Sequence, residues 1–241
     1  MVENVPVTDL PAEDRRRRLA ADILDFSIAP VPAWYRRTAQ SLLDEFERGS
    51  FGKPIHDEML HMWFADAWSI VRNMHTMAQL IRGAPSDITI QVSPRSERLL
   101  TACSSLRNSM DHIVGNLRNL ASKTERPMSP LQGTLTAVVT PALEPGDTTS
   151  ELYHIVITQS AWHHRFSMEP VPPDDELFPI TGRIGAVRLH AFDSIVNLSS
   201  AAALAQDFHR QLQPFLNIDR PGRLSHVLRQ DFDQPLTVSW P

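Results

Sequence analysis

Six consecutive residues, Arg107 to His112 (Arg-Asn-Ser-Met-Asp-His), hold the groups of this chain that are best suited to act together on a substrate. The imidazole of His112 is a side chain of the type that can accept or donate a proton at neutral pH. The guanidinium of Arg107 keeps its positive charge and can stabilise negative charge on a substrate. Asp111 follows Arg107 by four residues, so on a helix we expect an ion pair that holds the guanidinium in one direction.

The five-residue spacing between Arg107 and His112 restricts how the two groups can cooperate. On an ideal helix it separates their directions by about 140° and their heights by about 7.5 Å. The two side chains then flank the apolar seam of the helix on opposite sides. They converge on one substrate only if the helix bends or if a second copy of it lies alongside. The geometry therefore requires a distortion or a homodimer.

A polar stripe on the same helix favours the homodimer. Asn108, Asp111, His112, Gly115 and Asn119 fall on the face opposite the apolar seam. A glycine in a helix interior costs about 1 kcal/mol relative to alanine, so another contact should favour it there. Close approach of a second backbone at Gly115 is one such contact.

The arrangement Arg107, Asn108 and, after four intervening residues, His112 resembles the signature of the HEPN superfamily, helical-bundle proteins that often act as metal-independent ribonucleases in toxins and antiviral systems. The resemblance implies that Arg107 contacts and polarises the scissile phosphate and that Asn108 orients the site. His112 would be the general acid or base, with the RNA 2′-hydroxyl as nucleophile. It also implies RNA as substrate, an antitoxin protein as partner, and no metal or cofactor.

A second, shorter stretch, Arg72-Asn73-Met74-His75, echoes this motif with only two residues between arginine and histidine. We interpret it as structural, although Arg72 could line the same groove as Arg107 and bind substrate. The main stretch also resembles a group of uncharacterised bacterial proteins with an Arg-Ser-Ala-Leu-Asp-His core and a later Phe-Pro-Ile, which occurs here as Phe178-Pro179-Ile180. That likeness implies no activity.

Two other functions remain open. The first is a non-catalytic helical module that binds or regulates another protein. The second is a metal-bound bundle enzyme, but His61 and His75 lie about 21 Å apart along one helix, and the sequence has no His-x3-His pair to chelate one ion. The single cysteine, Cys103, lies in a predicted apolar seam and should be a core thiol.

The elements that would position these residues are four predicted helices. Apolar periodicity predicts helices from Pro11 to about Phe26, from Ala33 to Arg48, from about Ile55 to Arg82, and from about Pro94 to Leu120. Pro30 and Pro32 should break the chain between the first two. The third and fourth helices each carry a heptad seam, which predicts packing at a small crossing angle in an antiparallel four-helix bundle.

The second half of the chain shows strand signals. After the proline-containing stretch 124–133, short β-branched segments predict antiparallel strands at Leu135–Thr140, Leu152–Thr158 and Ile184–His190. Ser199 and Ser200 should cap a helix that carries Leu204, Phe208, Leu212 and Phe215 on one face, and we expect further short strands at Ile88–Val92 and Leu236–Trp240. The predicted fold is α+β, with a flexible arm at residues 1–11, a helical bundle domain at 12–125 and a β-rich domain at 126–241.

Bulk composition limits the partners. The 241 residues carry a formal net charge of -5, so any contact with RNA should be local. No apolar run reaches the roughly 20 residues that span a bilayer, so we expect no membrane contact. The lone cysteine fits a reducing compartment, and we expect the protein to be cytoplasmic.

Overall fold

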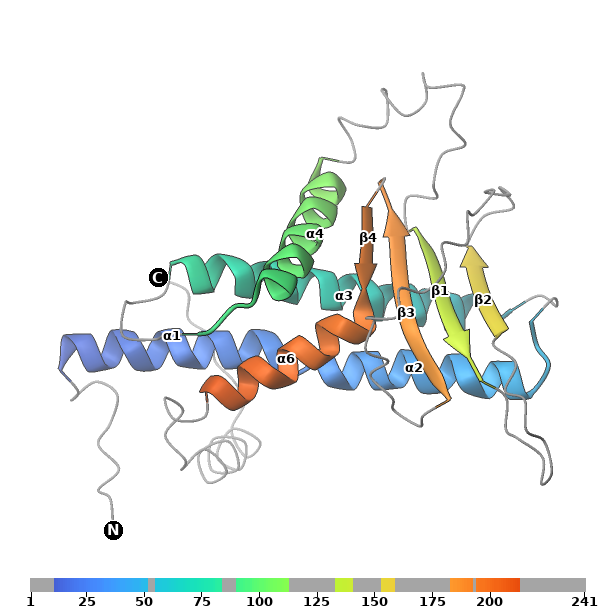
Figure 1. The fold of residues 1–241 in the computed structure, drawn as a ribbon, viewed down its shortest axis with the longest axis horizontal. Helices are drawn as coiled ribbons and strands as arrows, with labels where there is room; N and C mark the ends of the chain where they lie inside the picture. The colour runs from blue at the N-terminus through green and yellow to red at the C-terminus, as the bar shows by residue number, and fades with distance from the viewer. Residues whose placement is uncertain are drawn as a thin grey trace, which may run out of the picture.

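The chain folds into an α+β structure in which helices pack against a four-stranded antiparallel sheet (Figure 1). The structure is a computed structural model that describes residues 11–51, 55–83, 90–112, 133–140, 153–158, 183–192 and 194–212. The helices are α1 (Ala12–Ile28), α2 (Val31–Glu47), α3 (Asp57–Arg82), α4 (Pro94–Asp111) and α6 (Leu198–Leu212). The strands are β1 (Thr134–Val139), β2 (Tyr153–Thr158), β3 (Ile184–Ala191) and β4 (Ser194–Asn197).

The joint between α1 and α2 determines how the helices are arranged. Pro30 and Pro32 lack amide donors, and Pro30 separates the two helices. Ala29 and Pro30 nevertheless keep right-handed helical dihedral angles, with φ and ψ of -54° and -39° at Ala29 and -78° and -18° at Pro30. The prolines therefore interrupt the hydrogen bonding without turning the chain, and α1 and α2 follow one another along nearly one line (Figure 1).

This joint is the physical reason why the described helices do not show the expected four-helix bundle. A bundle needs α2 to fold back beside α1, whereas here α3 runs alongside both of them. Moreover, α4 contacts α3 but is inclined steeply to it in Figure 1, where the heptad seams predicted a small crossing angle. Helix α6, from the C-terminal half, contacts α1, α2 and α3.

The sheet has the order β2-β1-β3-β4, and every neighbouring pair is antiparallel. The three strands predicted from the sequence are present, and β4, which was not predicted, forms a hairpin with β3. The β1–β3 register shifts between Thr136 and Val138, so two residues of β3 oppose one of β1, which is a β-bulge. Ala186 lies at this bulge with a positive φ of 46°.

The serine at position 199 compensates for the bulge and does not cap α6 as predicted. Its side-chain oxygen accepts a 3.0 Å hydrogen bond from the backbone N–H of Val187, beside Ala186. It also shares a 2.9 Å hydrogen bond with the buried hydroxyl of Tyr35 on α2. The capping bond comes from Asn197, whose Oδ1 accepts from the Ser200 backbone N–H at 3.0 Å.

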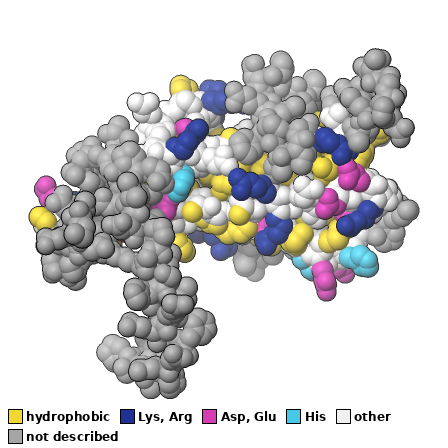
Figure 2. Space-filling view, turned by 90° about the horizontal axis from the view of Figure 1, so that it is seen from below, with side chains coloured by type: hydrophobic (Ala, Val, Ile, Leu, Met, Phe, Trp, Pro, Cys, Tyr) yellow, Lys and Arg dark blue, Asp and Glu magenta, His cyan; other side chains and the backbone are white. Residues whose placement is uncertain are grey.

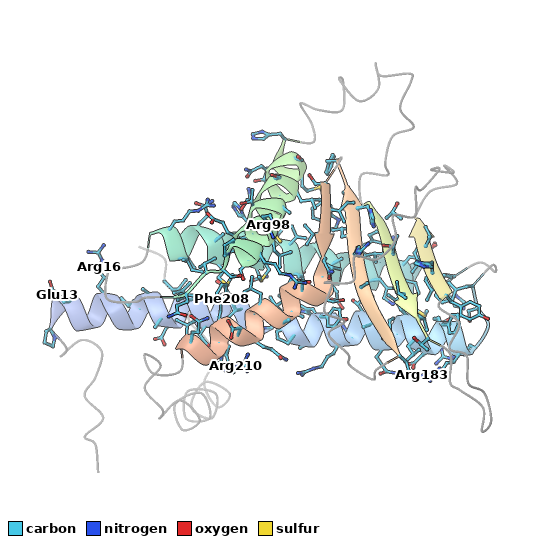
Figure 3. The ribbon with its side chains drawn as sticks, viewed as in Figure 1. Glu13, Arg16, Arg98, Arg183, Phe208 and Arg210 are labelled. Atoms are coloured by element: carbon cyan, nitrogen blue, oxygen red, sulfur yellow. The ribbon has the colours of Figure 1, made fainter. Side chains whose placement is uncertain are left out.

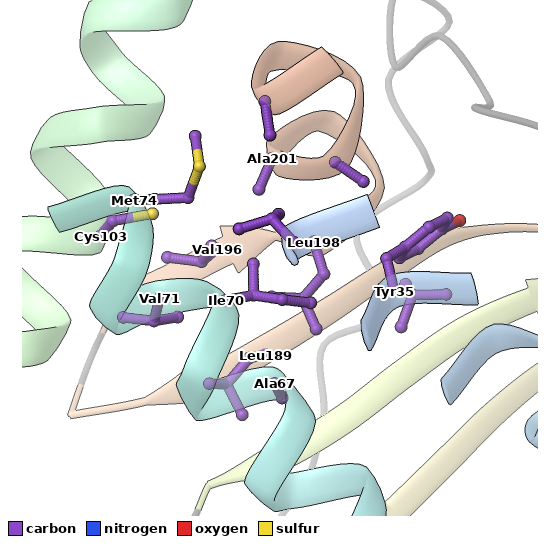
Figure 4. Close-up of a cluster of buried hydrophobic side chains, with 14 of the residues drawn as sticks. Tyr35, Ala67, Ile70, Val71, Met74, Cys103, Leu189, Val196, Leu198 and Ala201 are labelled. Carbon is purple, nitrogen blue, oxygen red and sulfur yellow. The ribbon is translucent and has the colours of Figure 1, made fainter. Parts of the chain in front are cut away.

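Apolar side chains of the helices and the sheet form one contiguous core. Figure 4 shows part of it, where Ile70 and Met74 of α3 lie near Leu189 and Val196 of the sheet and Leu198 of α6. Aromatic pairs extend the contact, with Phe46 packed on Tyr153 at 5.3 Å and Trp68 edge-on to Phe192 at 6.5 Å between ring centroids. Cys103 is fully buried in this core, where burial raises its thiol pKa to about 12, as expected for a core thiol.

Other sequence predictions fall partly outside the described residues. Residues 90–92 are not a strand, in contrast to the prediction for Ile88–Val92. The expected continuation of the fourth helix to Leu120, the arm at residues 1–10 and the strand at Leu236–Trp240 lie outside the described residues. Within the described helices, no segment is both long and apolar enough to cross a membrane.

Candidate functional site at the C-terminal end of helix α4

Helix α4 positions the candidate residues because its two ends and its buried face are well defined. Ser93 caps the helix, its side-chain oxygen accepting from the Ser96 backbone N–H at 3.1 Å, and Pro94 occupies the first turn. Leu100, Cys103 and Leu106 are the buried residues of the helix, and they belong to the core. This burial fixes the rotation of α4 and so determines which side chains reach solvent near its end.

The helix ends at Asp111, where His112 is the C-cap residue. The His112 backbone N–H donates to the carbonyl oxygens of Asn108 and Met110. The side chains of His112 and Asn108 are both exposed to solvent. His112 therefore lies at the helix terminus, whereas the sequence predicted that it lies in a helix interior.

Arg107 forms the predicted ion pair with Asp111, four residues later. The Arg107 and Asp111 side chains are 37% and 43% exposed, so the pair lies at the surface with one edge against the protein. Exposed pairs of this spacing contribute only about 0.3 to 0.5 kcal/mol to stability, so the main consequence is orientation. The guanidinium is held in one direction while remaining accessible to a ligand.

His75 of α3 is the residue that sequence reasoning left out of the site. Its Nδ1 lies 3.1 Å from the Ser104 hydroxyl of α4, one turn before Arg107. Burial lowers the pKa of His75, and the positive charges of Arg107 and Arg82 lower it further. An imidazole and a guanidinium from two different helices are thus neighbours within a single chain.

The echo of the motif at residues 72–75 was the available signal for His75. Its two intervening residues, compared with four in Arg107–His112, favoured a structural interpretation of this stretch. What could not be read from the sequence is the rotation of α3 against α4, which brings His75 to Ser104. Arg72, the other residue of this echo expected near the site, is exposed on α3 three residues before His75.

These groups have a defined chemical capacity. A lowered pKa keeps the His75 imidazole neutral at pH 7, so it can accept a proton, and the partly exposed Arg107 guanidinium can bind an anionic oxygen. Among the described residues, no group of three or more His, Cys, Asp or Glu side chains is arranged to hold a metal ion. Gly115 and Asn119 of the polar stripe, and Phe178-Pro179-Ile180, lie outside the described residues.

Comparisons of the chain with protein-family models, with curated proteins and with solved structures gave no significant match. The resemblance to the HEPN superfamily therefore depends on the motif residues Arg107, Asn108 and His112 and on their chemistry.

Proposed function

We propose that this protein is a metal-independent endoribonuclease of the toxin or antiviral-defence type, acting through Arg107 and His112. In this proposal Arg107 binds the scissile phosphate, Asn108 orients it, and His112 transfers a proton while the RNA 2′-hydroxyl attacks. Asp111 holds the guanidinium, and Arg72 contributes a further contact to the substrate backbone. An antitoxin protein would bind over this end of α4 and block it.

The observation that carries the proposal is the accessibility of the motif. A guanidinium sealed in the core would be unable to reach a phosphate, whereas Arg107 is 37% exposed and oriented by Asp111. His112 and Asn108 are exposed beside it, at the end of the same helix.

The geometry of the two groups leads to the proposal of a homodimer. Arg107 and His112 of one chain point in different directions on the ideal helix that the sequence predicts. Two copies of α4 lying side by side would place Arg107 of one chain near His112 of the other. Each of the two composite sites formed in this way would lose activity when the copies separate.

Cleavage of a single-stranded RNA in the presence of EDTA tests the proposal directly. We expect Arg107→Ala and His112→Ala to reduce the cleavage rate by at least about a hundredfold, because each removes a group used in the transition state. Mixing the two inactive variants should restore part of the activity if the site is composite. In each mixed dimer, one of the two composite sites then keeps both Arg107 and His112.

Matched controls separate the motif from general charge effects. Arg16→Ala changes an exposed arginine of α1, and His56→Ala changes an exposed histidine 19 residues before His75, about 28 Å along α3. Both should cleave at the wild-type rate. Absence of EDTA-resistant cleavage by the wild-type protein, or equal cleavage by Arg107→Ala, would remove the nuclease proposal.

A second function, non-catalytic association, is favoured by one surface. Leu19, Ile23 and Phe26 share one face of α1 and are 49%, 48% and 83% exposed. Beside Leu19 and Ile23 lies a largely apolar groove of about 540 Å³ between α1 and the end of α3. Such a surface suits self-association of two chains. Sedimentation should then show a dimer that Phe26→Asp converts to a monomer, with no RNA cleavage by either protein.

A further inference from the structure

A second region of the molecule combines a cavity with positive charge, and it is separate from the motif at the end of α4. A cleft of about 530 Å³ lies between the first turns of α4 and the β4–α6 segment. Arg98 of α4 lines it, and on an ideal helix the nine residues from Arg98 to Arg107 correspond to about 180° of rotation and 13.5 Å of rise. The two regions therefore lie on different sides of α4.

Three arginines line this cleft against a single carboxylate. Arg95 and Arg98 come from α4 and Arg210 comes from α6, and Figure 3 labels Arg98 and Arg210 on these two helices. The carboxylate is Asp207, which accepts from Arg210 Nη2 at 3.2 Å and from Gln211 Nε2 at 2.8 Å. The charged side chains that line the cleft are therefore mainly basic, and its carboxylate is already engaged on the α6 side.

The charge of the cleft is local. The chain as a whole has a formal net charge of -5. On the face shown in Figure 2, arginine side chains are interspersed with acidic and apolar ones and form no continuous basic surface. A long polyanion is attracted by an extended basic track. A cavity of limited volume with a few converging arginines is better suited to a small anion-bearing molecule.

Hydrogen-bonding groups and an apolar floor complete the cleft. Ser96 and Ser200 contribute hydroxyl groups, and Leu99, Ala203 and Leu204 contribute apolar surface. Asn197 also lines it, and its Oδ1 is bound to the Ser200 backbone N–H, while its buried Nδ2 has no hydrogen-bond partner among the described residues. A buried amide donor without a partner is uncommon in proteins, but this atom is closed off from solvent and does not itself face the cleft.

We propose that the cleft between α4 and α6 binds a phosphate-bearing small molecule with an apolar or planar portion, of the nucleoside monophosphate kind. Arginine forks hold phosphate oxygens with two parallel hydrogen bonds, which matches the guanidinium groups on the α4 wall. The apolar floor contacts the uncharged part of the ligand. This site is independent of the proposed nuclease chemistry, and its ligand is a bound molecule and not a cleaved substrate.

Calorimetric titration with AMP, adenosine and inorganic phosphate tests the site on the full chain. We expect AMP to bind, inorganic phosphate to compete with it, and adenosine to bind at least tenfold more weakly. Arg98→Gln and Arg95→Gln should each weaken AMP binding at least tenfold, because each removes a charged donor. Arg16→Gln, which removes an exposed arginine at the far end of α1 (Figure 3), should leave AMP binding unchanged.

The binding of AMP, adenosine and RNA distinguishes a small-molecule site from a nucleic-acid site. No binding of AMP by the wild-type protein would overturn it, as would equal binding by Arg98→Gln. Equal affinity for adenosine and AMP would overturn the role of the phosphate. Tight binding of a short single-stranded RNA through Arg95 and Arg98, without binding of AMP, would assign the cleft to nucleic acid and overturn the small-molecule proposal. Because the readout is binding, failure of the nuclease proposal would leave these results unaffected.

Discussion

At the scale of single residues, the contact between His75 and the end of α4 links the chemistry of the motif to the packing of two helices. His75 is held at Ser104, and its pKa is lowered by burial and by the charges of Arg107 and Arg82. Because the charge of Arg107 acts on His75 across the interface between α3 and α4, the pKa of His75 depends on the position of Arg107. Titration of His75 therefore measures the arrangement of the candidate site without any substrate.

Replacing Arg107 by glutamine should raise the pKa of His75. The substitution removes one of the two positive charges that oppose protonation of the imidazole. NMR titration of the histidine resonances measures the shift. Arg72→Gln is the matched control, because Arg72 is exposed on α3, the helix of His75, and is not among the causes that lower the His75 pKa. An unchanged His75 pKa in Arg107→Gln would contradict the proximity of the two groups.

Protonation of His75 should also make stability depend on pH. Its folded-state pKa lies below the unfolded value of about 6.5, so between these two values the unfolded chain binds more protons. The free energy of unfolding contributed by His75 is therefore fully present above pH 6.5 and is lost as pH falls toward the folded pKa. Denaturant titrations at pH 7.5 and 5.5 should show a smaller loss for His75→Gln than for the wild-type protein.

His190 contributes with the same sign. Its pKa is lowered by burial and by Arg188, and its Nε2 lies 2.9 Å from the Thr136 hydroxyl. Stability of the His75→Gln variant should thus still fall on acidification, and His190→Gln should reduce that remaining loss. Equal pH dependence in the wild-type protein and in both variants would show that neither imidazole has a lowered pKa.

Gly133 is required by its surroundings, which the sequence alone did not indicate. It has a φ of +91°, and an added Cβ would lie 2.6 Å from the carbonyl oxygen of His190. Gly133→Ala should lower the free energy of unfolding by about 3 kcal/mol, from backbone strain plus the clash. Gly49→Ala is the control, since Gly49 has a φ of +64° but open space around it, and should cost about 1 kcal/mol. Equal losses would contradict the close approach to His190.

Much of the candidate site could be predicted from residue types and spacing, and part of it could not. The ion pair between Arg107 and Asp111 followed from their four-residue spacing, because local helix geometry determines it. The neighbourhood of His75 and Arg107 depends on how two helices rotate against each other, which no local spacing encodes. The prediction that Ser199 caps α6 was wrong for a similar reason, because at the bulge in β3 the Val187 backbone N–H donates to its hydroxyl.

At the scale of elements, Ser199 joins three of them. Ser199 lies at the start of α6. Its hydroxyl accepts a hydrogen bond from the Val187 backbone N–H at the bulge of β3 and shares a second one with the Tyr35 hydroxyl of α2. Ser199→Ala leaves a buried backbone N–H and a buried phenol without this partner, so the free energy of unfolding should fall by about 2 kcal/mol. Tyr35→Phe should cost about 1 kcal/mol. Chemical denaturation of both variants and of the double variant measures the coupling.

The double variant decides whether the hydrogen bond exists. If Tyr35 and Ser199 share it, the combined loss should be smaller than the sum of the two single losses, because the same interaction is counted in both. Strictly additive losses would contradict the contact. Leu43, also buried on α2 but about 12 Å along the helix from Tyr35, offers a control, since Leu43→Ala removes apolar packing at a distance and its loss should add to that of Tyr35→Phe.

The limits of sequence-based prediction at this scale are seen at Pro30. The described helices α1, α2 and α3 and the strands β1, β2 and β3 were predicted within a few residues, since apolar periodicity is local. The arrangement of the helices was not, because a proline predicts the loss of a hydrogen bond and not the direction in which the chain continues. Helical dihedral angles at Ala29 and Pro30 keep α1 and α2 in line, so the described helices do not show the expected bundle.

At the scale of the whole molecule, helices and sheet depend on one core. Trp63 and Met74 of α3 and Leu189 of β3 all belong to the same buried cluster. Removing residues 126–241 would expose the helical side of this cluster, including the surfaces that α6 covers. The fragment 12–125 alone should therefore lack cooperative unfolding, while hydrogen exchange in the full chain should report loss of α3 and β3 at the same denaturant concentration. A fragment with a sharp thermal transition would contradict this prediction.

The in-line joint at Pro30 has a mechanical consequence. From Ala12 to Glu47, α1 and α2 together form a strut of about 54 Å, roughly the length of 36 helical residues. Two missing amide donors make its middle the most compliant point, and a cavity of about 370 Å³ lined by Ile28, Ala29 and Pro32 lies directly beside it. Bending at this joint would consequently change the packing of α1 against α3 and α6.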